Sequence, residues 1–330
     1  MPRQLSNPRP RRLPGGGPRP PAHRALPRLP ERAGVSARAL ALAALLALAL
    51  PAPGGAAPLR VAVSVLPEQA FVSAVAGSLA TVDVLVGPGR SPATYEPTPR
   101  QMASLADAAL FLPMGVPFEQ AWLPRLTAAA PGLRVVDLVA AAGIERLTLH
   151  GHSHGDAPAS PAGAELDPHL WTDPRLVARL LPPLADALCA ADPAHCDAFR
   201  AGAAAYADTL AALDAELRAI LAPVRGRRFL VFHPSWGYFA AAYGLEQVAI
   251  EHEGKEPGAR ALANVIDAAR ASGLRTIFVQ RQFASGAARA VADAIGGDVI
   301  AVDPLAADYC ANLRRTARIM AAALAAEDSP

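Results

Sequence analysis

Short apolar runs alternate with helical patterns of hydrophobic residues along the first half of the chain, starting at residue 59. The apolar runs predict strands at 59–65, 81–87, 109–115 and 133–139. The intervening patterns predict helices at 67–77, 98–108 and 117–129. Because strand and helix alternate, these elements predict a parallel sheet with helices packed on it.

One long helical pattern follows this region. A predicted helix at 173–191 leads into it, and the pattern then runs without interruption through residues 192–224. Apolar residues from Phe199 to Leu221 recur there in steps of three and four, which marks one face of a helix. A helix of roughly 28 residues would be about 42 Å long, enough to span two lobes.

Strands and helices alternate again beyond the long helix. The predicted strands are 227–234, 245–250, 274–280 and 298–304, and the predicted helices are 236–244, 259–273, 285–297 and 306–324. We therefore expect an α/β fold with two lobes, each a mostly parallel sheet flanked by helices, joined by one long rigid linker helix. The expected division is 1–57 leader and signal peptide, 58–190 N-terminal lobe with a histidine-rich loop at 150–156, 191–224 linker helix, and 225–330 C-terminal lobe.

The leader differs from the rest of the chain in charge. Residues 1–38 hold nine arginines and one acid, Glu31, so the formal net charge of +2 comes from the leader and the remainder is acidic. An apolar run at 39–50 and several small residues follow, which is typical of a secretory signal peptide, here with cleavage after Ala57. No cysteine directly follows that run, so we expect an exported protein without a lipid anchor. An acidic body also argues against a nucleic-acid partner.

Three cysteines remain open to two interpretations. In an oxidising compartment Cys189 and Cys196 can close a small disulfide loop, with Cys310 left over, or all three can be buried free thiols. Their wide spacing does not match a zinc site built from paired cysteines.

Histidines gather in one part of the chain. Four of the eight lie within residues 150–169. His150, His152 and His154 alternate with small residues and show neither helical nor strand periodicity, which favours a flexible loop that gathers metal ions. The alternative is a solvated loop without a role in binding.

Three further residues have the chemistry of fixed metal ligands. His233 and Asp303 end predicted strands, and His169 precedes the helix at 173–191. Ligands of open parallel sheets bind beyond the carboxyl ends of the strands, so these three side chains can converge on one cleft between the lobes. Two imidazoles and a carboxylate suit zinc, with water or another side chain in the fourth position. Taken singly, a histidine after a strand is more often a hydrogen-bonded structural residue, and an Asp-Pro pair is more often the start of a helix.

Several segments in the same order resemble the periplasmic metal-binding proteins of zinc and manganese ABC importers. They include DPHLWTDP, VFHPSWGYFAAAYGL, IEHEGKEP and AVDPLAADY, and the resemblance extends over residues 59–325. It implies the metal-type periplasmic binding protein fold, a location in the periplasm and delivery of a divalent transition metal to an ABC transporter permease in the inner membrane. His169, His233 and Asp303 match the family's ligand positions.

One ligand position departs from the family pattern. The family usually has a histidine before the Glu-Pro-Thr-Pro segment, where this chain has Ala93, and alanine cannot coordinate a metal. Three replacements are open: a water molecule, a histidine of the loop, or Glu251 or His252 from the second lobe. Imidazole ligands favour Zn²⁺, whereas Mn²⁺ becomes the alternative if Glu251 joins Asp303.

Other classes of function receive less support from the sequence. A zinc hydrolase would share the three-ligand pattern, but the chain has no His-Glu-x-x-His, Gly-x-Ser-x-Gly or phosphate-loop motif, so we expect no enzyme. A metal-dependent adhesin is compatible with the same fold. The expected partners are the metal ion and the permease, and the chain is expected to act as a monomer.

Overall fold

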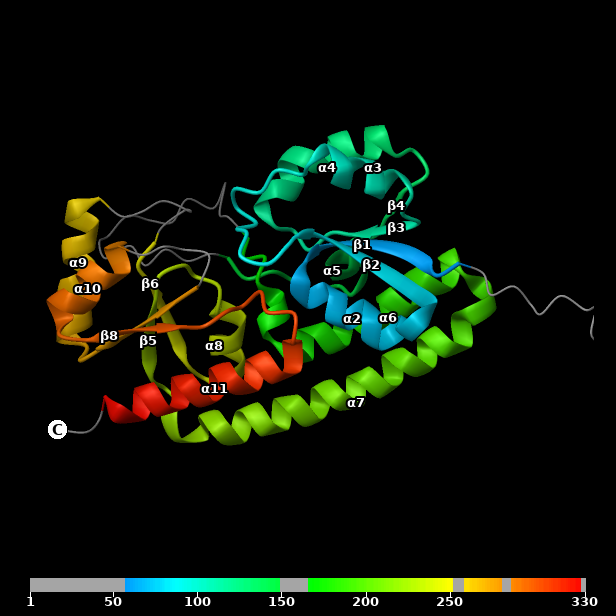
Figure 1. The fold of residues 1–330 in the computed structure, drawn as a ribbon. Coiled ribbons are helices and arrows are strands. Elements are labelled where there is room, and N and C mark those ends of the chain that lie inside the picture. The colour runs from blue at the N-terminus through cyan, green and yellow to red at the C-terminus, as the bar shows by residue number, and fades with distance from the viewer. Residues whose placement is uncertain (1–56, 149–165, 252–257, 281–285, 328–330) are drawn as a thin grey trace, which may run out of the picture. The chain divides into compact units, whose positions relative to one another are not determined.

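The computed structural model describes residues 57–148, 166–251, 258–280 and 286–327 (Figure 1). The predicted leader and signal peptide, the histidines of the loop at 150–154, and His252 lie outside these ranges. No described helix is long and apolar enough to cross a membrane.

A four-stranded parallel sheet forms the centre of the N-terminal lobe. Its strands are β1 (Leu59–Val65), β2 (Ala80–Val86), β3 (Leu110–Leu112) and β4 (Arg134–Val135), in the order β2-β1-β3-β4. The helices are α2 (Leu66–Ala76), α3 (Pro99–Ala106), α4 (Pro117–Ala129), α5 (Leu138–Ala141) and α6 (Pro174–Ala191). The central strand β1 reads as an almost continuous apolar run because both of its faces are covered, and its last five residues are buried.

The C-terminal lobe repeats this plan. Its strands are β5 (Arg228–Val231), β6 (Glu246–Ala249), β7 (Thr276–Val279) and β8 (Asp298–Ala301), all parallel and in the order β6-β5-β7-β8. The helices are α8 (Gly237–Tyr243), α9 (Ala259–Ala271), α10 (Gly286–Ile295) and α11 (Tyr309–Ala326). The predicted α/β fold with two parallel-sheet lobes is confirmed, and the two sheets share one strand order.

The long linker helix is α7 (Cys196–Leu221), which packs against α2, α6 and α11 (Figure 1). Its buried face consists of the apolar residues that the periodicity predicted, apart from the half-buried Tyr206. Gly202 lets α7 approach α2 closely, because a Cβ at this position would overlap the carbonyl oxygen of Val75. The helix is shorter than the predicted segment, since residues Pro193–His195 and Ala222–Val224 form 3₁₀ turns at its two ends.

Two other details bear on the sequence predictions. The predicted strand at 133–139 is only two residues long, because the Asp137 carboxylate accepts hydrogen bonds from Val139 and Ala140 N–H and so starts α5. Cys189 and Cys196 form a disulfide that joins the end of α6 to the start of α7. Cys310 has a free, half-buried thiol.

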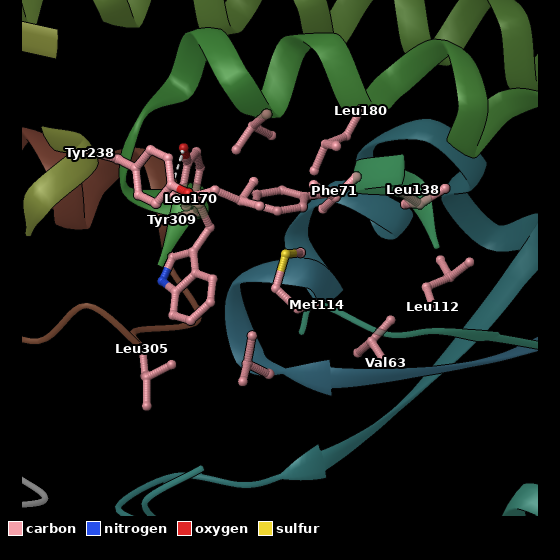
Figure 2. Packing of buried hydrophobic residues seen from close by; sticks show 14 of the residues in the cluster. Val63, Phe71, Leu112, Met114, Leu138, Leu170, Leu180, Tyr238, Leu305 and Tyr309 are labelled. Carbon is pink, nitrogen blue, oxygen red and sulfur yellow. Dashed lines mark hydrogen bonds between the residues drawn. The ribbon is translucent and has the colours of Figure 1, made fainter. Parts of the chain in front are cut away.

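One hydrophobic core extends through both lobes. It contains buried residues of β1, β3 and α6 and continues along α7. It also includes Trp236 just before α8, Phe239 on α8, and Tyr309 and Met320 on α11. Figure 2 shows part of this cluster, with Tyr238, Tyr309 and Leu170 gathered at one end. A smaller core lies between the C-terminal sheet and the helices α9 and α10. The lobes are therefore joined by packed side chains as well as by the linker helix.

Candidate metal centre

His169 is held by an acidic residue two positions before it. The Asp167 carboxylate accepts a 2.9 Å hydrogen bond from the His169 backbone N–H and a 2.7 Å bond from its Nδ1. A carboxylate only accepts, so the hydrogen of the neutral ring lies on Nδ1 and the Nε2 lone pair is left for a metal ion. Burial lowers the pKa of His169, although Asp167 opposes this shift. The lowered pKa favours the neutral ring, which is the form that binds a metal ion.

His233 has the same arrangement with a different carboxylate. It follows β5, and its Nδ1 lies 3.1 Å from Oε2 of Glu251, which follows the neighbouring strand β6. Glu251 is buried, and its backbone N–H donates to the Phe232 carbonyl, so the parallel pairing of β5 and β6 brings the two residues together. Because a carboxylate only accepts, the hydrogen of a neutral His233 ring also lies on Nδ1.

The structure brings the two predicted histidines together in an edge-to-face arrangement. Their ring centroids lie 5.2 Å apart with an interplanar angle of 78°, and Trp171 packs its ring edge against His169 from another side. The side chains of His169 and His233 are 11% and 15% exposed, so water reaches each ring over a small area. Two imidazoles from segments 64 residues apart thus form one pair.

Asp303 follows β8 and is tied to the same region through its neighbours. Its carboxylate accepts from Leu305 N–H, and its carbonyl accepts from the Asn312 side chain at 2.6 Å. The indole of Trp171 donates to the Pro304 carbonyl at 2.8 Å, which links the segment of His169 to the residue beside Asp303. Within the described ranges, however, no group of three histidine, cysteine or acidic side chains is arranged to hold a metal ion.

Ala93 contributes only a methyl group. It lies in an exposed turn before α3, where its backbone N–H donates to the Ser91 hydroxyl at 3.3 Å. Neighbouring Tyr95 is buried and donates to Gln101 at 2.7 Å. The turn is thus well defined, and its side chain at position 93 has no donor atom for a metal ion.

The two supporting carboxylates are the functional residues that sequence reasoning missed. Asp167 was given no role in the sequence prediction, and Glu251 was considered only as a direct ligand. The Asp-Pro-His spacing carries a usable signal, because an aspartate often accepts the backbone N–H two residues further on. No local signal marks Glu251, whose contact with His233 depends on strand pairing.

Two lobes with parallel sheets, one long linker helix and a pair of adjacent imidazoles, one after β5 and one before α6, define a periplasmic binding protein of the metal-binding type. The chain belongs to the family described as zinc-uptake complex component A, periplasmic (ZnuA), which matches residues 61–323. This family is a solute-binding component of zinc uptake and not an enzyme family. The sequence resemblance is thereby confirmed.

Individual relatives agree with this assignment. The crystal structure of a ZnuA deletion mutant with zinc bound is 39% identical, with a TM-score of 0.73 over 81% of this chain and 98% of that chain. The high-affinity zinc uptake system protein ZnuA of Paracoccus denitrificans is 32% identical over 191 residues, which cover 50% of this chain and 57% of that protein.

A third relative combines two activities. The laminin-binding protein (Lmb) of Streptococcus agalactiae, described as having adhesin and metal transporting activity, is 26% identical, with a TM-score of 0.67 over 81% of this chain and 99% of that chain. Against curated proteins, the matches span 45% to 66% of the relatives' own lengths, about half in most.

Proposed function

We propose that this chain captures Zn²⁺ in the cleft between its lobes and delivers it to an ABC transporter permease of the inner membrane. Membership of the periplasmic zinc-uptake family supports the transport role, the periplasmic location and a permease as partner. We further propose that the mature protein is a monomer. We propose that it has no lipid anchor, since no cysteine directly follows the apolar run of the leader.

One observation carries the proposal. His169 and His233 face each other at 5.2 Å between ring centroids, and each ring has its Nδ1 bonded to a carboxylate. This is the arrangement in which zinc-binding histidines are usually found, because the carboxylate fixes the ring and makes its other nitrogen a better donor. A buried histidine with a purely structural role does not require a second histidine beside it that is also bonded to a carboxylate.

We propose Asp303 as the third ligand. Its place after β8 and the Trp171–Pro304 hydrogen bond beside it support a position next to the histidine pair. Ala93 supplies no donor atom, so the fourth position is left open. There we favour water over the loop histidines, as in other zinc sites with three protein ligands. We assign Glu251 to supporting His233, since its carboxylate is already engaged by Nδ1. His252 then remains the alternative ligand from the second lobe.

The choice of metal follows from the donors. Two imidazoles and one carboxylate suit Zn²⁺, whereas Mn²⁺ prefers sites richer in oxygen. If Glu251 turned from His233 to the metal, the site would have two carboxylates and Mn²⁺ would become the better match. Competition between the two ions for the purified protein separates these alternatives.

Metal titration of the purified protein tests the proposal. We expect one tightly bound Zn²⁺ per chain, lost in both His169→Ala and His233→Ala. His195→Ala is the matched control, because His195 also has its Nδ1 on a carboxylate, that of Asp192 at 2.6 Å, but lies at the start of α7. Tight binding that persisted in both site variants would contradict the proposed centre.

The histidine-rich loop forms a second part of the proposal. We propose that His150, His152 and His154 gather zinc ions loosely, as their alternation with small residues favours. In the same titration, deletion of residues 150–156 is expected to lower the total zinc bound and leave the single tight site intact. An unchanged titration would leave the loop without a role in binding.

Adhesion is the alternative function that a specific finding favours. The likeness to the laminin-binding protein supports it, at 26% identity. Binding of the purified protein to a laminin-coated surface, with and without Zn²⁺, distinguishes this function from transport. An adhesin would be retained on the surface, whereas a dedicated transport protein would remain in solution.

A further inference from the structure

The first two residues of α8 form a seat for Asp167, the residue that holds His169. Tyr238 donates its hydroxyl to the Asp167 carbonyl at 3.0 Å, and the same hydroxyl accepts the Leu147 backbone N–H at 2.8 Å. Gly237 lies against the other end of Asp167, where a Cβ would stand 3.0 Å from the carboxylate oxygen Oδ2. Tyr238 of α8 thus holds the backbone of Asp167, and Gly237 leaves room for its carboxylate.

This seat is buried and joins the two lobes. Tyr238 is 3% exposed and Asp167 is 2% exposed, and the bond between them is buried, whereas the bond from Leu147 N–H is part-buried. Tyr238 belongs to the C-terminal lobe, whereas Leu147 and Asp167 belong to the segments on either side of residues 149–165. Buried hydrogen bonds of this kind are costly to leave unmade, which keeps the three groups in one arrangement.

The seat also lies on the same segment as the second histidine. His233 precedes α8 by four residues, so α8 is fixed relative to His233 by a short stretch of chain. Asp167 is in turn bonded to both the backbone and Nδ1 of His169. A continuous path of short contacts therefore runs from His233 through α8 and Asp167 to His169.

We propose that Gly237 and Tyr238 are positioning residues that set the separation of His169 and His233. This inference rests on the proposed function of the two histidines as zinc ligands. Zinc holds imidazole nitrogens at about 2.0–2.1 Å, so a shift of one ring by a few tenths of an ångström weakens the site. Tyr238 acts on the backbone of Asp167 and Gly237 acts by leaving room for its carboxylate.

Two substitutions test the seat from opposite sides. Tyr238→Phe removes the hydroxyl and keeps the ring in the core, and Gly237→Ala places a methyl group against Asp167 Oδ2. The controls are Tyr243→Phe, a buried tyrosine on the same helix, and Gly286→Ala, at the first residue of α10 where a Cβ would meet nothing within 4 Å. Zinc affinity is measured by chelator competition, and coordination geometry by the visible absorption of bound Co²⁺.

We expect both seat variants to bind zinc about ten- to a hundredfold more weakly, the range found for residues that orient metal ligands. Their Co²⁺ bands should shift in position or intensity, which a loss of stability alone would not cause, while both controls behave as the parent protein. Unchanged zinc affinity and Co²⁺ bands in both seat variants would overturn the inference. If His169→Ala and His233→Ala also kept tight zinc, the proposed function itself would fail.

Discussion

At the scale of single residues, the two candidate ligands are supported in different ways. Asp167 reaches His169 within one turn of chain and fixes both its backbone and its ring. Glu251 reaches His233 across paired strands and contacts the ring alone. In both cases the carboxylate selects the tautomer that leaves Nε2 unprotonated. Both rings are therefore oriented by a carboxylate in the folded chain.

Removal of either carboxylate should weaken zinc binding without abolishing it. We expect Asp167→Ala and Glu251→Ala each to lower zinc affinity by about ten- to a hundredfold, because the ring loses its fixed orientation and some of its basicity. Asp192→Ala removes the corresponding partner of His195 and should leave zinc affinity unchanged. Isothermal titration with a competing chelator measures all three. Equal affinity in all variants would show that the carboxylates do not support the ligands.

At the scale of elements, two connections of the N-terminal lobe use the same device. Glu68 of α2 accepts hydrogen bonds from Ser64 and Val65 N–H at the end of β1, and Glu119 of α4 accepts from Met114 and Gly115 N–H after β3. Each glutamate is the third residue of its helix and is buried. Because β1 and β3 are neighbouring parallel strands, two buried carboxylates lie at the C-terminal ends of adjacent strands.

These carboxylates should make stability depend on pH. Burial raises the pKa of Glu68 well above its usual 4.5, and the charge of Glu119 adds to the shift; burial also raises the pKa of Glu119. The folded chain therefore binds protons more readily than the unfolded chain, so this contribution to stability is complete below pH 4.5 and is lost as the pH rises through the folded pKa values.

Glu68→Gln should reduce this loss. Chemical denaturation from pH 4.5 upward is expected to show a smaller decline in unfolding free energy for the variant than for the parent chain, because glutamine does not titrate. Glu96→Gln, at an exposed position before α3, is the control and should retain the parent slope. A variant with the same slope as the parent would mean that Glu68 does not contribute to the pH dependence.

The order of elements was predictable from the sequence because it depends on local periodicity. Alternating apolar runs gave both parallel sheets, and the steps along α7 gave its buried face. Hydrophobic periodicity did not reveal α5, which begins through the Asp137 cap directly after β4. Within the site, residue type pointed to His169 and His233, but the Tyr238–Asp167 contact spans 71 residues and follows only from the packed fold.

At the scale of the whole molecule, the lobes are held together by shared burial. The core that includes β1 and α6 continues through α7 to α8 and α11, and the ion pair of Arg314 with Glu216 joins α11 to α7 at 2.5 Å. Two lobes with separate cores would unfold independently, whereas a common core couples their unfolding. We expect the described lobes to behave as one cooperative unit.

Thermal unfolding tests this expectation. Circular dichroism and tryptophan fluorescence should give one coincident transition, since Trp122, Trp171 and Trp236 report from different parts of the chain. Zinc at a hundredfold excess over its Kd should stabilise the folded chain by about 2.7 kcal/mol and shift the whole transition upward. Two separate transitions, or an upward shift of only one of them, would contradict a common unit.

The exposed methyl group of Ala93 has a consequence for the rate of metal exchange. At the proposed centre, three protein ligands leave one position of the zinc coordination sphere to water, which an incoming donor can replace without first breaking a protein–metal bond. Zinc could then pass to a receiving protein through a brief state in which ligands of both proteins bind the ion. An alanine in place of a fourth protein ligand would in this way shorten the residence time of zinc at the proposed centre.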